Sequence, residues 1–355
     1  SDSMVTRFDA IIGHRGVIEL LEREIVEPAQ SYLFVGPSNV GKATVARRFA
    51  AALLCGDDHH CFDRVLAGLH PDLVLVEPEG RASITVDQAR SVVSQATRTP
   101  LESDRKVFLL EEGGMMNDEA ANALLKTLEE PTPATVFVIV AETEDDLPET
   151  VASRCRTVVL GRVSEAEVAA GLAQLGVEED QATEAARIAG GRPGLALALA
   201  TEPQVADYRR VWLSVPMRLG EHPGDAFRLA DETMAAAEPL LAALKERQQE
   251  ERDALGDDAP RSLRDRQTRE LKRASDALYV TGLEILASFY RDVAAAQFGS
   301  PVRNTDVPVS ALSSMTPRKA IAGAERILVA VEALATNQRP QLAFANLFSE
   351  LAGDV

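Results

Sequence analysis

The feature that most constrains the fold is a glycine-bounded loop between an apolar run and a helical stretch. Residues 31–36 read Ser-Tyr-Leu-Phe-Val-Gly, and Val45–Leu54 has a helical pattern. A strand, a glycine-bounded loop and a helix form the context of a phosphate-binding loop, in which backbone N–H groups wrap a phosphate and a lysine reaches its outer oxygens. The residues predicted to bind nucleotide here are Gly36, Pro37, Ser38, Asn39, Val40, Gly41, Lys42, Ala43 and Thr44.

This loop departs from an active one at a single position. The residue after Lys42 should be Ser or Thr, whose hydroxyl binds Mg²⁺, but Ala43 stands there. Thr44 lies about 100° further around the helix and should not substitute for it. We expect ATP or ADP to bind, if at all, without efficient hydrolysis. The alternative is a relic loop that holds nothing.

Alternating strands and helices surround the loop. Short segments rich in Val, Ile and Phe are typical of buried parallel strands. They are Asp72–Val76, Lys106–Glu111, Thr135–Ala141 and Thr157–Leu160, with helical stretches at Val86–Thr97 and Asp118–Glu130 between them. This order predicts a parallel α/β sheet.

Beyond Gly161 the strand patterns stop. Ser164-Glu-Ala-Glu167 is a capping box that opens a helix. Two further short helices, Ala182–Ala189 and Leu195–Ala200, flank a break at Gly190–Gly194. From about residue 205 the pattern is helical to the end, and the charge-rich residues 245–276 predict a helical face that is either solvated or partly disordered.

Composition excludes several classes of protein. The chain is 46% hydrophobic with no apolar run of 18 residues, which argues against a membrane span. A net charge of −18 argues against a protein whose main task is to grip a phosphate backbone. Three cysteines do not suggest a disulfide framework, and we expect a cytoplasmic location. Ser1-Asp-Ser-Met4 is interpreted as a remnant before the native start, with no signal peptide after it.

Two motifs carry a family resemblance. Glu119-Ala-Ala-Asn-Ala-Leu-Leu-Lys-Thr-Leu-Glu-Glu130 is followed by Pro131, and Ser153-Arg-Cys-Arg156 comes some twenty residues later. Together they resemble the clamp-loader branch of the AAA+ ATPases of bacterial DNA polymerase III, from about residue 8 to about 348. The resemblance implies an AAA+ α/β domain with a five-stranded parallel sheet over residues 5–161. A small helical lid over 162–205 and an all-helical collar (oligomerisation) domain over 206–355 should follow. Pro340 suits the first turn of a last collar helix.

By this resemblance Arg154 is an arginine finger that acts in trans on a neighbouring subunit's ATP. Phosphoryl transfer places negative charge on the γ-phosphate oxygens, and a planar, permanently charged guanidinium can stabilise it. The alternative is a surface arginine that caps a helix C-terminus.

Other positions of the implied site depart from the active pattern. Glu111 occupies the place of the metal-binding Asp, while Glu112 keeps the acid that polarises water. Two solvated acids at a strand end are the alternative. Thr143 is a candidate sensor or an ordinary turn threonine, and Arg192 lies near the place of a lid arginine.

Relatives often carry a four-cysteine zinc knob after the first helix. Here Cys55-Gly-Asp-Asp-His-His-Cys61 keeps two cysteines, with His59 and His60 as the remaining candidates. Four ligands within one heptapeptide are too close together for a comfortable tetrahedron. We therefore expect that zinc has been lost.

The resemblance implies a stator-like subunit with weak or no ATPase activity of its own, which helps load a sliding clamp onto primed DNA during replication. Expected partners are the motor subunits and delta subunit of a hetero-pentamer, the clamp, and primer-template DNA mainly through the complex, but no membrane. The alternatives are an ATP-hydrolysing motor subunit of the same ring and a stand-alone AAA+ DNA-processing ATPase. A metabolic kinase lacks a recognisable substrate-binding insert.

Overall fold

The chain forms two compact units, Ser1–Leu197 and Ala198–Val355, each of which is described by itself. A computed structural model describes residues 7–9, 11–37, 40–78, 83–130, 132–220, 222–255, 261–335 and 338–353. The predicted Ser38, Asn39 and Pro131 lie outside these ranges.

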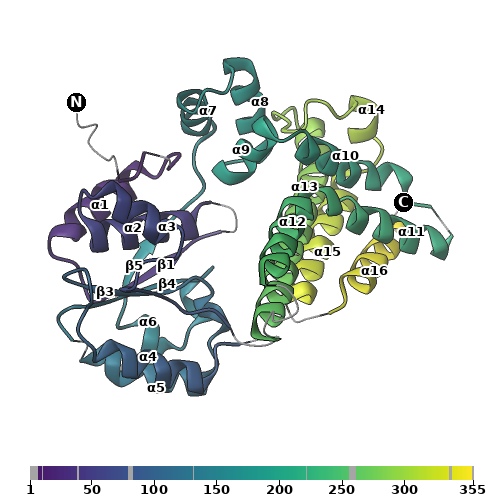
Figure 1. Cartoon of the computed structure of the whole chain (residues 1–355). Coiled ribbons are helices and arrows are strands. Elements are labelled where there is room, and N and C mark those ends of the chain that lie inside the picture. The colour runs from purple at the N-terminus through teal and green to yellow at the C-terminus, as the bar shows by residue number, and fades with distance from the viewer. Residues whose placement is uncertain are drawn as a thin grey trace. The chain divides into compact units, whose positions relative to one another are not determined.

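A five-stranded sheet forms the centre of the first unit (Figure 1). Its order is β2-β3-β4-β1-β5, and every neighbouring pair is parallel. The strands are β1 (Ser31–Val35), β2 (Leu73–Leu75), β3 (Lys106–Leu110), β4 (Thr135–Val140) and β5 (Arg156–Val159). The sheet expected from the sequence is confirmed, with strand ends that differ by at most one residue.

Helices cover both faces of this sheet because its central strands are apolar on both sides. In β1, Tyr32 and Phe34 face one core, while Leu33 and Val35 face the other. Figure 1 shows helices packed on both faces. They are α1 (Arg15–Val26), α2 (Lys42–Cys55) and α3 (His59–Leu66) on one, and α4 (Val86–Ala96), α5 (Asp118–Glu129) and α6 (Glu149–Ala152) on the other.

Three short helices follow the sheet: α7 (Glu165–Gln174), α8 (Glu179–Ala189) and α9 (Pro193–Thr201). The predicted capping box is confirmed, since the Ser164 hydroxyl accepts from the Glu167 N–H and the Glu167 carboxylate accepts from the Ser164 N–H. The division between the two compact units falls within α9. The predicted domain boundaries at 161 and 205 stay predictions.

The described part of the second unit contains helices and no strands, as predicted. Trp212 is fully buried at its centre, with its ring 5.3 Å from that of Phe344 and 6.3 Å from that of Phe348. Pro340 opens the last helix as expected. The helices are α10 (Pro203–Arg218), α11 (Pro223–Ala235), α12 (Glu238–Leu255), α13 (Arg261–Gln297), α14 (Val309–Leu312), α15 (Pro317–Ala335) and α16 (Pro340–Gly353).

Among the described residues, no helix combines the length and the apolar character that a membrane crossing requires.

Candidate functional site

A cleft of about 520 Å³ lies where the carboxyl ends of β3 and β4 meet the first turn of α2. This edge of a parallel sheet is where α/β proteins commonly bind ligands. The cleft brings together several predicted residues that are far apart in sequence. It is lined by Gly41, Lys42, Ala43, Thr44, Glu111, Glu112, Gly114, Met115, Val140, Ala141, Glu142, Asp146 and Gly194.

Two glycines give the loop its path into α2. Gly36 has a φ of 152°, and a Cβ there would lie 2.0 Å from the carbonyl oxygen of Leu160. Gly41 precedes α2 with a φ of 101°, a conformation that L residues rarely adopt. Val40 between them is buried in the core under the loop, so it supports the site without lining it.

Lys42 folds back onto its own loop. Its Nζ donates to the carbonyl oxygens of Gly36 at 2.5 Å and Pro37 at 2.8 Å. Burial lowers the pKa of Lys42, while the nearby carboxylates of Glu142 and Asp146 act in the opposite direction. The loop carbonyls therefore hold the ammonium group that, in a phosphate loop, reaches the phosphates.

Glu111 is already paired with a cation. Arg47 donates two hydrogen bonds to it, from Nε to Oε1 and from Nη2 to Oε2, the second at 2.7 Å. This pairing raises the pKa of Arg47 further above its usual value. The sequence analysis missed Arg47, although it lies four residues after Ala43 and so on the same face of α2. Its guanidinium neutralises the carboxylate that the sequence analysis places at a metal-binding position.

Thr143 is held within a turn after β4. Its hydroxyl donates to Asp146 Oδ1 at 3.0 Å, and the backbone N–H groups of Glu142 and Thr143 both donate to Asp146 Oδ2 at 2.9 Å. Thr143 is not among the lining residues of the cleft, whereas Asp146 and Glu142 are. This geometry is that of a turn threonine.

Arg192 is also absent from the lining of the cleft. Its side chain is buried between α8 and α9, where Nε donates to the Ala189 carbonyl at 2.8 Å. Its neighbour Gly194 does line the cleft. The first turn of α9 thus lines the cleft through Gly194, two residues after Arg192.

Arg154 lies two residues after the end of α6 and is not among the residues that line the chain's own cleft. Its Nη1 donates to the Thr150 carbonyl at 2.6 Å, and its Nη2 pairs with the Glu129 carboxylate. About a third (34%) of the Arg154 side chain is exposed. The two family motifs therefore contact each other through this ion pair. Next to it, burial raises the pKa of the Cys155 thiol to about 11, so that thiol stays protonated at neutral pH.

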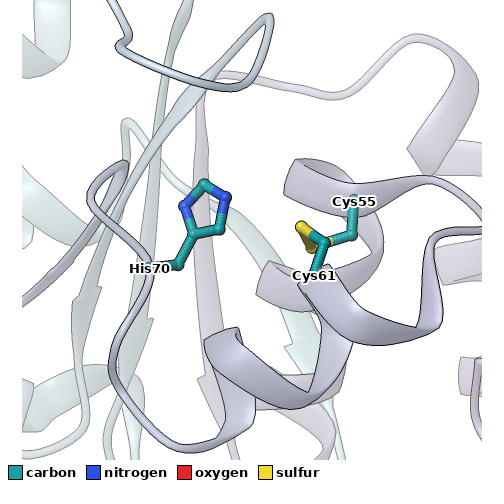
Figure 2. A group of neighbouring side chains, drawn as sticks. All are labelled: Cys55, Cys61 and His70. Carbon is teal, nitrogen blue, oxygen red and sulfur yellow. A yellow bond between two sulfur atoms is a disulfide. The ribbon is translucent and has the colours of Figure 1, made fainter.

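The cysteine segment differs from its expected state. Cys55 and Cys61 form a disulfide, a pairing that the sequence analysis did not predict. Among the described residues, the third potential metal ligand near these sulfurs is His70, not His59 or His60 (Figure 2). Their ligand atoms all lie within 4.8 Å of one another. Since zinc binds thiolates, the paired sulfurs do not fit a zinc ion.

Comparisons with known proteins agree with the resemblance. Residues 13–164 match the family described as DNA polymerase III, delta subunit. The chain is 41% identical over 137 residues to the DNA polymerase III subunit delta' of Pseudomonas aeruginosa, covering 36% of this chain and 42% of that protein. It is 28% identical over 166 residues to the subunit tau of Bacillus subtilis, covering 44% of this chain and 30% of that protein. The chain thus spans less than half the length of these curated relatives.

A solved structure covers more of the chain with weaker similarity. The gamma subunit-related protein of DNA polymerase III from Thermotoga maritima is 16% identical, with a TM-score of 0.42 over 94% of this chain and 98% of that one. That likeness is too weak to add to the assignment.

Proposed function

From the match of residues 13–164 to the delta-subunit family of DNA polymerase III, we propose that this chain is a stator-like delta-prime subunit of a bacterial clamp loader. In the cytoplasm it joins motor subunits and a delta subunit in a hetero-pentamer that loads a sliding clamp onto primed DNA. Primer-template DNA is contacted mainly through the assembled complex, which accords with the acidic net charge of −18.

The Arg47–Glu111 ion pair beside Ala43 is the observation that favours a subunit without efficient hydrolysis over a motor subunit. Phosphate-loop ATPases hold Mg²⁺ with a loop hydroxyl and an acid at the end of a neighbouring strand. Here the hydroxyl is replaced by a methyl group, and the acid is occupied by a guanidinium. The cleft therefore suits a bound nucleotide that is not hydrolysed efficiently, and it disfavours the motor-subunit alternative.

In this proposal Arg154 acts on the ATP of a neighbouring subunit and not on this chain's own cleft. Its partly exposed guanidinium is held by the Thr150 carbonyl and the Glu129 carboxylate, which define its direction. A guanidinium has five N–H donors, so it can exchange the Glu129 contact for γ-phosphate oxygens and keep its backbone contact. Such fingers are worth about 10³-fold or more in turnover where they have been measured.

The division of labour follows the predicted domains. The AAA+ domain (5–161) presents Arg154, the lid (162–205) closes over the cleft, and the collar (206–355) mediates assembly. Loss of Arg154 should therefore leave ring assembly intact, because assembly rests on a distant part of the chain.

A reconstituted complex of this chain with motor and delta subunits tests the proposal. Arg154→Ala should lower DNA- and clamp-stimulated ATPase activity partially, since the motor subunits carry their own fingers. Arg154→Lys should rescue poorly, because an ammonium loses the planar fork. Arg156→Ala is the matched control, as Arg156 is bound to Glu24 at 2.7 Å.

Unchanged turnover with Arg154→Ala in an intact ring would remove the trans role. Failure to co-purify with delta and motor subunits would overturn the delta-prime assignment itself. Robust magnesium-dependent turnover by the chain alone, abolished by Lys42→Ala, would favour the motor subunit instead.

A further inference from the structure

Three reactive side chains meet at the end of α2 that lies away from the cleft. Cys55 is the last residue of α2, Cys61 belongs to α3, and His70 precedes β2 (Figure 2). At 1.5 Å per residue this end of α2 is about 20 Å from Lys42. We propose that Cys55 and Cys61 are a thiol–disulfide exchange site for low-molecular-weight thiols, with His70 as its positioning residue.

The surroundings fix the ring of His70 and its tautomer. His70 is buried, and its Nδ1 accepts a hydrogen bond from the backbone N–H of Asp72 at 3.1 Å. An imidazole nitrogen that accepts carries no proton, so the neutral ring has its proton on Nε2. The fully buried Asp72 carboxylate holds the adjoining loop in turn, accepting N–H groups at 2.7, 2.8 and 2.9 Å from residues 101–103.

One ring nitrogen of His70 lies within 4.8 Å of both sulfurs, close enough for electrostatic attraction to a thiolate that forms when the disulfide opens. The Glu102 carboxylate is 3.8 Å from Nε2, too far for a hydrogen bond. That carboxylate instead accepts from Arg64 at 2.9 and 3.3 Å. In Figure 2 a ring nitrogen of His70 lies on the side of the two cysteines.

This arrangement favours sulfur chemistry over metal binding. A protonated ring nitrogen cannot ligate a metal ion, whereas an N–H donor beside a sulfur stabilises a thiolate. Both cysteines are only partly buried as residues, although they pack against the edge of the core beside α1–α3, so the proposal requires that a small thiol reach them from the exposed side. Accessible sulfurs beside a donor are typical of exchangeable disulfides.

The exchange balances with a low-molecular-weight thiol as reductant. Its thiolate attacks one sulfur and forms a mixed disulfide. The Cys55–Cys61 bond breaks, and its electron pair leaves on the other sulfur as a thiolate, which the His70 Nε2–H stabilises. A second small thiol attacks the mixed disulfide and releases the small disulfide. The protein gains two electrons and two protons, two small thiols are oxidised, and the reverse reaction restores the bond.

The test uses the full-length chain carrying Cys155→Ser, which leaves Cys55 and Cys61 as its two cysteines. The protein is equilibrated in mixtures of reduced and oxidised glutathione, alkylated with iodoacetamide and measured by mass spectrometry. We expect one reversible two-electron transition in which no more than a small fraction is mixed disulfide.

Two substitutions separate positioning from packing. The amide oxygen of His70→Asn can replace Nδ1 as acceptor for the Asp72 N–H, but the side chain offers no donor to sulfur. His70→Gln places an amide N–H near the position of Nε2. For His70→Asn we expect the equilibrium constant for reduction by glutathione to fall about tenfold, which lowers the reduction potential by about 30 mV. For His70→Gln we expect a reduction potential near that of the wild type.

The opposite order would be a wild-type reduction potential for His70→Asn and a changed one for His70→Gln. That result would mean that His70 has only a structural role, and it would overturn its part in the proposal. A pair that never reoxidises in the titration would overturn the exchange site. So would a reduced chain that takes up one zinc ion from zinc chloride and then resists oxidation, since that result identifies a metal site.

Discussion

Removing the positive charge of Arg47 should partly restore a magnesium site. The change is Arg47→Gln, made in a chain that also carries Ala43→Thr to supply the missing hydroxyl. Arg47 and Glu111 share two hydrogen bonds, and their side chains are 49% and 23% exposed. Exposed ion pairs are worth about 0.2–1 kcal/mol and buried hydrogen bonds to charged groups about 1.5–3 kcal/mol, so this pair is worth about 1–2 kcal/mol.

Mg²⁺ must displace the Arg47 guanidinium from Glu111 before it can bind the carboxylate. The positive charge of that guanidinium also repels the ion. Since about 1.4 kcal/mol is tenfold in affinity, Arg47→Gln should tighten magnesium-dependent nucleotide binding about 5- to 30-fold over Ala43→Thr alone. The assay is a titration with a fluorescent ADP analogue, in magnesium and in EDTA. Turnover should not appear, because Glu111 is one methylene longer than the usual Asp.

Arg48→Gln in the same Ala43→Thr background is the matched control. Arg48 is the next residue of α2, but it donates to the Arg7 carbonyl at 3.2 Å and lies 5.8 Å from the centre of the Phe62 ring. If Arg48→Gln raised the magnesium-dependent nucleotide affinity equally, the overall charge of the protein, and not the Arg47–Glu111 contact, would determine that affinity. Full magnesium-dependent affinity with Ala43→Thr alone would refute the idea that Arg47 occupies the metal position.

Three further outcomes are expected. Protein purified without added zinc should contain much less than one zinc per chain by elemental analysis, and stoichiometric zinc lost on Cys55→Ser would contradict this. Arg209 holds the pKa of the Asp306 carboxyl below its usual 3.8. The ion pair therefore stabilises the fold fully above pH 3.8, the usual pKa of the carboxyl. This stabilisation is lost as the pH falls through the lower pKa that Asp306 has in the folded protein. Asp306→Asn should therefore cost about 1 kcal/mol at pH 7 and flatten the acid dependence in urea titrations. Gly282→Ala would place a Cβ 2.0 Å from the Trp212 ring and should lower the free energy of unfolding by about 1–3 kcal/mol, whereas Gly353→Ala, with open space around it, should not.

Much of the fold was determined by local pattern. Strands buried on both faces need continuous apolar runs, so segments such as Thr135–Val140 were recognisable without any tertiary information. Helix starts at Ser164 and Pro340 were equally local, because a capping box and a first-turn proline act within one turn. The sequence by itself also located the glycine-bounded loop between β1 and α2, since the loop and its flanking elements are contiguous.

The candidate site was only half determined in this way. Sequence showed that Ala43 lacks a hydroxyl, but not that Arg47 neutralises Glu111, which is 64 residues away. It identified Arg154 and the motif that contains Glu129, but not the contact between them across 25 residues.

The disulfide region shows the same limit. Cys55 and Cys61 were considered together with His59 and His60, their neighbours in sequence, whereas folding brings His70 to the sulfurs. Residue types and spacing show which interactions are possible between residues that are close in the sequence. Which charges neutralise one another, and which ring faces a sulfur, depends on distances that only the packing of helices against the sheet decides.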